Sequence, residues 1–302
     1  MRRVDEAEAL QIGHHVAHGG RRQRRRVPLG RPGIEHVDDI LTVSEDLLSR
    51  ALLRLTGTSA GGAERLAAFF VLQLPAALFR VRWWTFWVTV ASVALAVLYG
   101  VWTANDPRVL ATLGSDADLR DLVDEGFVGY YSEFGEPAFA ARVFTNKAWI
   151  AAQCIAFGIT GVWVPYVLLQ NASNVGMTGG AMFAYGEGDT FLLYIAPHGL
   201  LELTSIFVAG AAGLKIFWSW VAPGGRTRVR ALAEEGRSLF TVAIAVALSL
   251  LVSGIVEGYV TRQDWPWPLK IGIGAAVLAG FLWVMLGAGR RAARAGATGD
   301  LD

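Results

Sequence analysis

The chain has 302 residues, of which 53% are hydrophobic, and it contains eleven tryptophans. Together with a mean hydropathy of +0.40, this composition is far from that of an average soluble domain and indicates an integral membrane protein. The formal net charge of +1 says little, because the charges are segregated along the chain. A single cysteine, Cys154, excludes an internal disulfide framework and a cysteine-based metal cluster.

Residues 1–60 contain no long apolar run, and residues 21–31 include six arginines among Gly and Pro. This composition predicts a poorly ordered basic region, and it lacks the apolar core of a signal peptide. Binding of anionic lipid or nucleic acid by the arginines is the alternative to a solvated tail. We favour the solvated tail and predict no nucleic-acid partner.

Apolar residues recur at helical spacing over residues 64–82, which end in Arg80 and Arg82. We expect an amphipathic juxtamembrane helix on the cytoplasmic surface. The first membrane span follows over residues 83–102, with aromatic residues at both ends as interfacial belts require.

Residues 103–146 carry eight acidic residues against three arginines, which predicts an acidic loop on the outer side. Six apolar residues in this loop follow a repeat of about 3.6 residues and predict a helix lying against the bilayer or the bundle. They are Leu119, Leu122, Val123, Phe127, Tyr130 and Phe134. An ordinary loop helix packed on its own protein is the alternative.

Two further spans, residues 239–260 and 269–287, are separated by eight residues and predict a helical hairpin. The tail at 289–302 is expected in the cytoplasm by the positive-inside rule. It contains three arginines close to the span, at positions 290, 291 and 294.

The middle of the chain predicts spans at residues 148–169 and 191–219, with a Gly-rich stretch at 172–186 between them. If that stretch did not cross, the basic loop before residue 239 would lie outside, against the positive-inside rule. We therefore predict a short third crossing helix. The expected fold is an all-α polytopic bundle of about six spans over residues 61–288, with amphipathic juxtamembrane helices and both termini cytoplasmic.

A Gly-rich helix too short to span alone must pack within protein, because lipid cannot satisfy its frayed backbone groups. Gly176, Gly179 and Gly180 favour close helix packing, with a pore or re-entrant element as the alternative. Gly210 and Gly213 in the next span form a second small face, suited to contact within the chain or in a homo-oligomer.

His198 and Glu202 are four residues apart and would project from one face of a helix that begins or kinks at Pro197. An intramembrane carboxylate costs about 2.5–3.5 kcal/mol on insertion scales, so Glu202 needs a partner inside the bundle. The candidate partners are His198, Glu257, Asn146, Asn171 and Asn174. The topology places His198, Glu202 and Glu257 in the outer half, where they can form one cluster.

Three interpretations compete for these residues. A structural polar cluster follows from the pairing of buried polar groups in membranes, and a proton or solute pathway from the functional use of intramembrane ionisable residues. A metal-dependent hydrolase comes third: His198, Glu202 and Glu257 supply three ligands but leave no general base, and the chain has no HExxH motif. We predict no metal, no cofactor and no catalytic residue.

The stretch APHGLLELTSIFVAGAAGLKI resembles the signature of the stage II sporulation protein M family of bacterial multi-spanning membrane proteins. TNKAWIAA, GMTGGAMFAYG and GIVEGYV carry further parts of the resemblance, which covers residues 69–287. The matching positions are Asn146, Pro197, His198, Gly199, Glu202, Gly210, Gly213 and Glu257. Relatives usually begin with a helical cytoplasmic domain, and the Arg/Gly/Pro-rich residues 1–55 depart from that pattern.

The resemblance implies a bacterial plasma-membrane protein of five or six helices without established catalytic residues. Its namesake joins peptidoglycan-remodelling enzymes during engulfment, so we expect a non-enzymatic scaffold that anchors envelope-remodelling partners. The alternative is a transporter-like permease subunit with a His/Glu path, and the third possibility is the metal hydrolase. A water-accessible cavity at Glu202 would favour transport, whereas a dry cluster would favour scaffolding.

Overall fold

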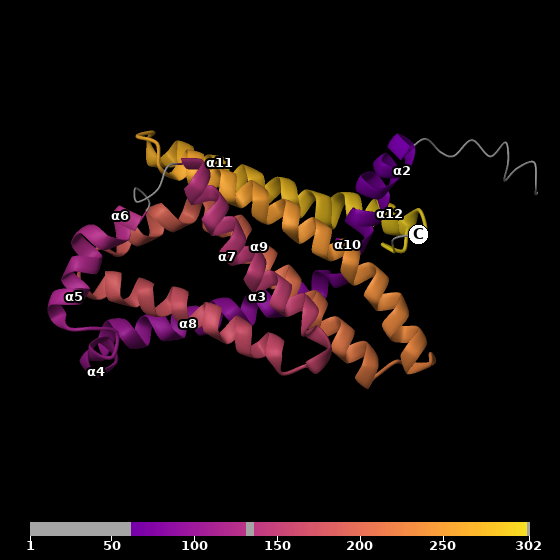
Figure 1. The fold of residues 1–302 in the computed structure, drawn as a ribbon, viewed down its shortest axis with the longest axis horizontal. Helices are drawn as coiled ribbons and strands as arrows, with labels where there is room; N and C mark the ends of the chain where they lie inside the picture. The colour runs from indigo at the N-terminus through magenta and orange to yellow at the C-terminus, as the bar shows by residue number, and fades with distance from the viewer. Residues whose placement is uncertain (1–61, 131–135, 301–302) are drawn as a thin grey trace, which may run out of the picture. The chain divides into compact units, whose positions relative to one another are not determined.

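The computed structural model describes residues 62–130 and 136–300, and these residues form helices and no β-strand (Figure 1). The all-α class is confirmed, whereas the predicted basic region at residues 1–60 lies outside the described residues. The α-helices in chain order are α2 (Gly62–Ala68), α3 (Leu74–Asn105), α4 (Pro107–Ala111), α5 (Asp116–Asp121), α6 (Phe127–Tyr130), α7 (Glu136–Ala156), α8 (Trp163–Ala184), α9 (Gly188–Val221), α10 (Arg228–Ile255), α11 (Trp267–Leu282) and α12 (Gly289–Arg294).

Short segments of other helical geometry continue or join these helices. Four of them are π-helical, at Phe69–Gln73, Leu122–Gly126, Val256–Thr261 and Trp283–Ala288, and a 3-10 turn lies at Gly158–Thr160. With these segments included, four helices are long and apolar enough to cross a membrane. They are Gly62–Asn105, Gly188–Val221, Arg228–Thr261 and Trp267–Arg294. The count of about six spans therefore stays a prediction.

The helix that contains the predicted first span does not begin at Trp83, because it runs without a break from Gly62 to Asn105. Pro75 stands in the first turn of α3, where a missing backbone N–H costs no hydrogen bond. Leu74 and Leu78 are buried rather than lying on a surface. The separate juxtamembrane helix expected at 64–82 is thus corrected to the start of one long helix.

The predicted boundary between the second and third spans was also wrong. Helix α7 ends at Ala156, the chain turns over residues 157–162, and α8 runs without interruption through Asn171 to Ala184. Gly161 adopts a φ of +72°, which favours glycine. The short Gly-rich helix at 172–186 is therefore the second half of a 22-residue helix, and residues 148–169 do not form one helix.

Helix α9 lies at the centre of the bundle and contacts α3, α7, α8, α10 and α11. Its residues Ile206, Val208, Ala209 and Ala211 have no exposed surface. They belong to the main hydrophobic core, which also includes residues of α3, α7, α8 and α10. Small side chains let these helices approach closely, as membrane bundles require.

Helices α4, α5 and α6 form the predicted helical part of the acidic segment, and they pack on the bundle. Leu119, Val123 and Phe127 are buried, and the Phe127 ring lies 5.7 Å from the ring of Phe191 on α9. Ser115 begins α5 with a capping box to Asp118. Of the other predicted face residues, Leu122 is exposed and Phe134 lies outside the described residues.

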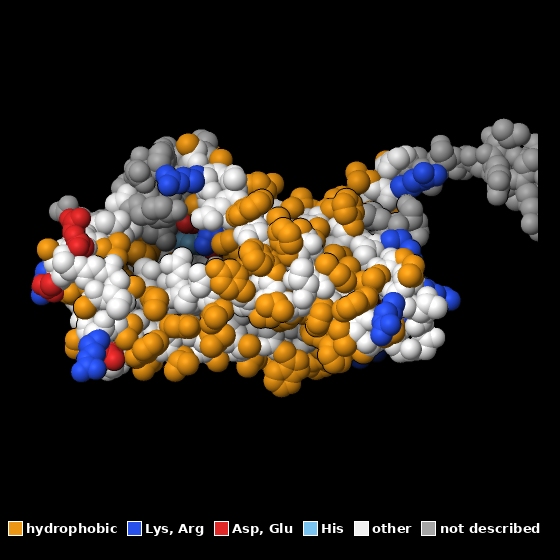
Figure 2. Space-filling view, turned by 60° about the horizontal axis from the view of Figure 1, so that its bottom comes forward, with side chains coloured by type: hydrophobic (Ala, Val, Ile, Leu, Met, Phe, Trp, Pro, Cys, Tyr) orange, Lys and Arg blue, Asp and Glu red, His pale blue; other side chains and the backbone are white. Residues whose placement is uncertain are grey.

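The surface of the bundle is apolar over its middle. Figure 2 shows hydrophobic side chains gathered between an end with acidic and basic groups and an opposite end with basic groups. Trp83 and Trp87 are 64% and 66% exposed on α3. Exposed aromatic and aliphatic side chains on this scale are typical of a lipid-facing surface.

Candidate polar cluster in the bundle

Three helices bring four ionisable side chains together. Helix α9 places His198 and Glu202 one turn apart on a buried face, the π-helical end of α10 supplies Glu257, and α7 supplies Lys147. One ligand atom from each of His198, Glu202 and Glu257 lies within 4.8 Å of the other two. These four residues are called the polar cluster below.

Lys147 is the partner of Glu202. Its Nζ lies 2.8 Å from Glu202 Oε1, and the two side chains are 26% and 6% exposed. Sequence reasoning missed Lys147, which directly precedes the span predicted at 148–169. The available signal was its place in TNKAWIAA directly after Asn146, which was itself a candidate.

His198 is held on both sides of its ring. Nδ1 lies 3.3 Å from Thr261 Oγ1, and Nε2 lies 3.6 Å from Glu257 Oε1. Its backbone carbonyl accepts a hydrogen bond of 3.0 Å from Ser253 Oγ on α10. The histidine therefore ties α9 to α10 through both its side chain and its backbone.

Glu257 is 4% exposed, and its Oε2 has no hydrogen-bond partner among the described residues. A buried carboxylate oxygen without a partner is costly, since it has lost water and gained nothing. This atom is the least satisfied part of the polar cluster.

A cavity of about 330 Å³ reaches the polar cluster, and all four of its residues line it. Figure 2 shows a hollow with acidic, basic and histidine side chains at its floor. Phe127, Val143 and Phe191 contribute apolar walls. The polar cluster is buried but lies beside a space that can hold water or a small ligand.

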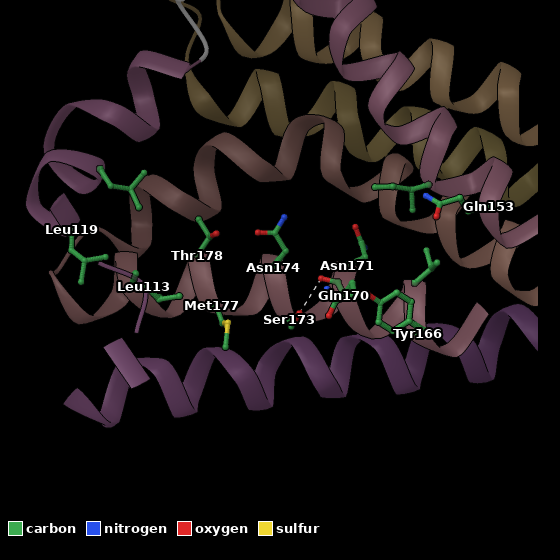
Figure 3. A pocket seen from close by; sticks show the side chains of 14 residues that line it. Leu113, Leu119, Gln153, Tyr166, Gln170, Asn171, Ser173, Asn174, Met177 and Thr178 are labelled. Carbon is green, nitrogen blue, oxygen red and sulfur yellow. Dashed lines mark hydrogen bonds between the residues drawn. The ribbon is translucent and has the colours of Figure 1, made fainter. Parts of the chain in front are cut away.

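The asparagines predicted as partners are divided between two cavities. Asn146 and Asn174 line the cavity of the polar cluster, whereas Asn171 and Asn174 line a larger one of about 630 Å³. In Figure 3 the side chain of Asn174 points away from α3. Neutral amides and hydroxyls dominate the polar lining of the larger cavity, at Gln153, Gln170, Asn171, Ser173, Asn174 and Thr178.

The predicted packing glycines lie at close helix contacts, with one exception. A Cβ on Gly176 would meet the carbonyl of Ala96 on α3, and one on Gly213 would meet the carbonyl of Cys154 on α7. The other close contacts are made by Gly179 with Phe191, Gly180 with Gly100 and Gly210 with Leu168. A Cβ on Gly199 would instead meet Ile195 of its own helix.

Pro197 does not begin a helix. Helix α9 runs through it from Gly188, and the backbone of Pro197 lies against Gly274 of α11, where a Cβ would meet its carbonyl. This close approach places α11 beside the start of the polar cluster.

A second group of buried charges, which the sequence did not indicate, lies at the end of the bundle that contains α12. Glu235 accepts from Arg80 at 2.9 Å and lies 2.7 Å from Lys215 Nζ. Glu235 thus joins α3, α9 and α10, and Arg80 also lies 3.4 Å from Asp300 Oδ1 in the C-terminal segment. This group lies on the opposite side of the fully buried stretch Ile206–Ala211 from the polar cluster.

The fold and the polar cluster together define a helical membrane protein with a polar cavity inside its bundle. The family model for stage II sporulation protein M matches residues 89–262, more than half of the chain, and the chain belongs to this family. The match covers every residue of the polar cluster. No curated protein and no solved structure matches the chain.

Proposed function

We propose that this protein is a non-enzymatic, multi-pass scaffold of the bacterial plasma membrane that anchors partners in cell-envelope remodelling. The proposal places both termini in the cytoplasm and α4–α6 on the outer side, and it allows self-association. Its protein partners would be the peptidoglycan-remodelling enzymes that the family resemblance implies.

The closed core beneath the polar cluster is the observation that carries this proposal. Ile206, Val208 and Ala209 follow Glu202 on α9 and have no exposed surface. Ser205 Oγ lies 2.7 Å from Ser249 Oγ of α10 at the same level. Packing of this kind suits a rigid support better than a path across the membrane.

The outer helices supply a surface on which a partner could dock. Asp116, Asp118, Asp121 and Asp124 are exposed on or beside α5, while Leu119 and Val123 fix these helices to the bundle. An exposed acidic surface on a rigid base suits electrostatic recognition of a basic partner domain.

A permease is the second candidate, and a specific observation favours it. The cavity that reaches Glu202 is the feature expected of a solute-binding membrane protein. Transport would require the packed stretch below Glu202 to open in a second conformation.

Photocrosslinking in the native membrane tests the scaffold proposal. A photoreactive residue at Leu122, 37% exposed beside α5, should form adducts with an identified peptidoglycan-remodelling enzyme. The matched position is Val97, 58% exposed on α3, where lipid is expected as the neighbour. No enzyme adduct from Leu122, together with solute flux into proteoliposomes that Glu202→Gln abolishes, would replace the scaffold by the permease.

A further inference from the structure

We propose that His198, Glu202 and Glu257 bind one divalent transition-metal ion of the Zn²⁺ type, with a further coordination position open to the adjoining cavity. This site goes beyond the scaffold proposal and does not depend on it, and it departs from the prediction of no metal made from the sequence.

The donor set fits such an ion, and its atoms lie close enough to contract around one. One imidazole nitrogen and two carboxylate oxygens are ligands that Zn²⁺ takes in proteins, at about 2.0–2.2 Å. Two ligands at that length on a tetrahedral ion are about 3.3 Å apart. His198 Nε2 and Glu257 Oε1 lie 3.6 Å apart, and the full set of ligand atoms lies within 4.8 Å.

The printed contacts of the ligands are compatible with a bound cation. Lys147 Nζ contacts Glu202 through Oε1, at 2.8 Å. When His198 Nδ1 carries the ring hydrogen and donates to Thr261, Nε2 presents a lone pair toward Glu257 Oε1. Neighbours that hold a ligand through its other atom are usual around protein metal sites.

Glu257 supplies an independent observation that points to a ligand. Its side chain is 5% exposed, it lines the cavity, and Oε2 has no hydrogen-bond partner among the described residues. A cation would satisfy that oxygen.

The cavity supplies the open position and an entry route. Apart from the ionisable groups, its polar lining consists of Asn146, Asn174 and Thr178, which can hold a metal-bound water or a small ligand. Three protein ligands with an open position are typical of accessible rather than purely structural zinc sites.

Equilibrium dialysis of the full-length protein against Zn²⁺, in detergent and with a tag that contains no histidine, tests the site. The wild type should bind one Zn²⁺ ion at this site. The Glu257→Gln variant should bind Zn²⁺ there with an affinity at least tenfold weaker. Glu234→Gln, which removes a carboxylate on α10 outside the site, is the matched control and should keep the ion. His14, His15, His18 and His36 are present in all three proteins, so the difference reports this site alone.

X-ray absorption at the zinc edge of the wild type gives a result that does not depend on a variant folding. The expected first shell has one imidazole nitrogen, with oxygens in the other positions. A shell with two or more imidazoles would assign the ion to the other histidines and overturn the proposal. The proposal would also be overturned by equal binding to the wild type and a folded Glu257→Gln variant, or by no binding to the wild type. A proton shared between His198 and Glu257 would then take the place of the ion.

Discussion

The two halves of α9 are held in the bundle by different interactions. The half that contains Pro197, His198 and Glu202 borders a cavity and is held by an ion pair and hydrogen bonds. The half from Ile206 to Gly213 is buried throughout and is held by close packing of its side chains. The close packing below the cavity and the polar contacts beside it can therefore be altered separately. Each of the following substitutions changes one of them.

The largest effect is expected from Gly213→Val in the shape-packed half. A Cβ there would meet the carbonyl of Cys154 and lie 3.0 Å from Val164 Cγ2, so α7 and α8 would have to move. We expect a loss of about 3 kcal/mol or more in unfolding free energy, measured by denaturant unfolding in mixed micelles. Gly272→Val on α11, where nothing lies within 4 Å of a Cβ, is the matched control and should change the unfolding free energy by less than about 1 kcal/mol. Equal stability of the two variants would contradict close packing at this level.

Lys147→Met should have the next largest effect, because it leaves Glu202 buried without the cation that lies 2.8 Å away. We expect a loss of roughly 2 kcal/mol, below the range for a fully buried pair since Lys147 is partly exposed. Adding Glu202→Gln to Lys147→Met should restore part of the loss, and a double-mutant cycle measures the coupling. Strictly additive losses would mean that the ion pair contributes nothing.

Glu202→Gln alone separates packing from chemistry. If Glu202 supplies only shape and hydrogen bonds, the variant should insert and support function, read as envelope integrity in a strain that depends on the protein. Loss of function with normal membrane insertion would show that its charge is used.

Ser205→Ala tests the boundary between the two halves and should cost about 1 kcal/mol. The substitution removes the 2.7 Å contact to Ser249 Oγ, while Ser249 keeps its bond to the Val246 carbonyl. Unfolding in mixed micelles measures the loss. A cost as large as that of Gly213→Val would mean that the boundary depends on this polar contact more than on packing.

The smallest effect is expected at Asp116 on α5. Hydrogen bonds from Tyr185 and then Arg120 lower the pKa of Asp116 below its ordinary value of 3.8. Because the folded-state pKa is lowered, the stabilisation is present at neutral pH and is lost as pH falls through that lowered value. Tyr185→Phe should raise the pKa of Asp116 in an NMR titration, and Arg120→Gln should raise it less. An unchanged pKa in Tyr185→Phe would rule out the 2.7 Å bond between Tyr185 Oη and Asp116 in solution.

Much of the fold was predictable because lipid imposes strong rules on composition. The apolar runs at residues 83–102, 239–260 and 269–287 fall within helices of the structure, since only a helix satisfies the backbone of an apolar run in lipid. The break at residues 157–162 was missed although Gly158 and Gly161 stand there. Asn171 and Asn174 were expected at the start of a short helix, but they lie inside α8 and line cavities.

The grouping of His198, Glu202 and Glu257 was predictable from topology, because helix direction and residue spacing set their depth. The role of Lys147 was not, since its pairing depends on where α7 begins and on how α7 packs against α9. Helix α7 begins at Glu136. Lys147 therefore lies about three turns inside the helix and not at its end.

Cysteine labelling at Asn174 tests the central claim, a polar cavity that faces outward above a closed core. In a Cys154→Ala background, Asn174→Cys should react with a membrane-impermeant thiol reagent added outside and not with reagent added inside. Ala209→Cys, at a site with no exposed surface, should stay unlabelled from both sides, and Gly225→Cys should react only from inside. Labelling of Asn174→Cys from the inside alone, or of Ala209→Cys from either side, would contradict the outward cavity and the closed core.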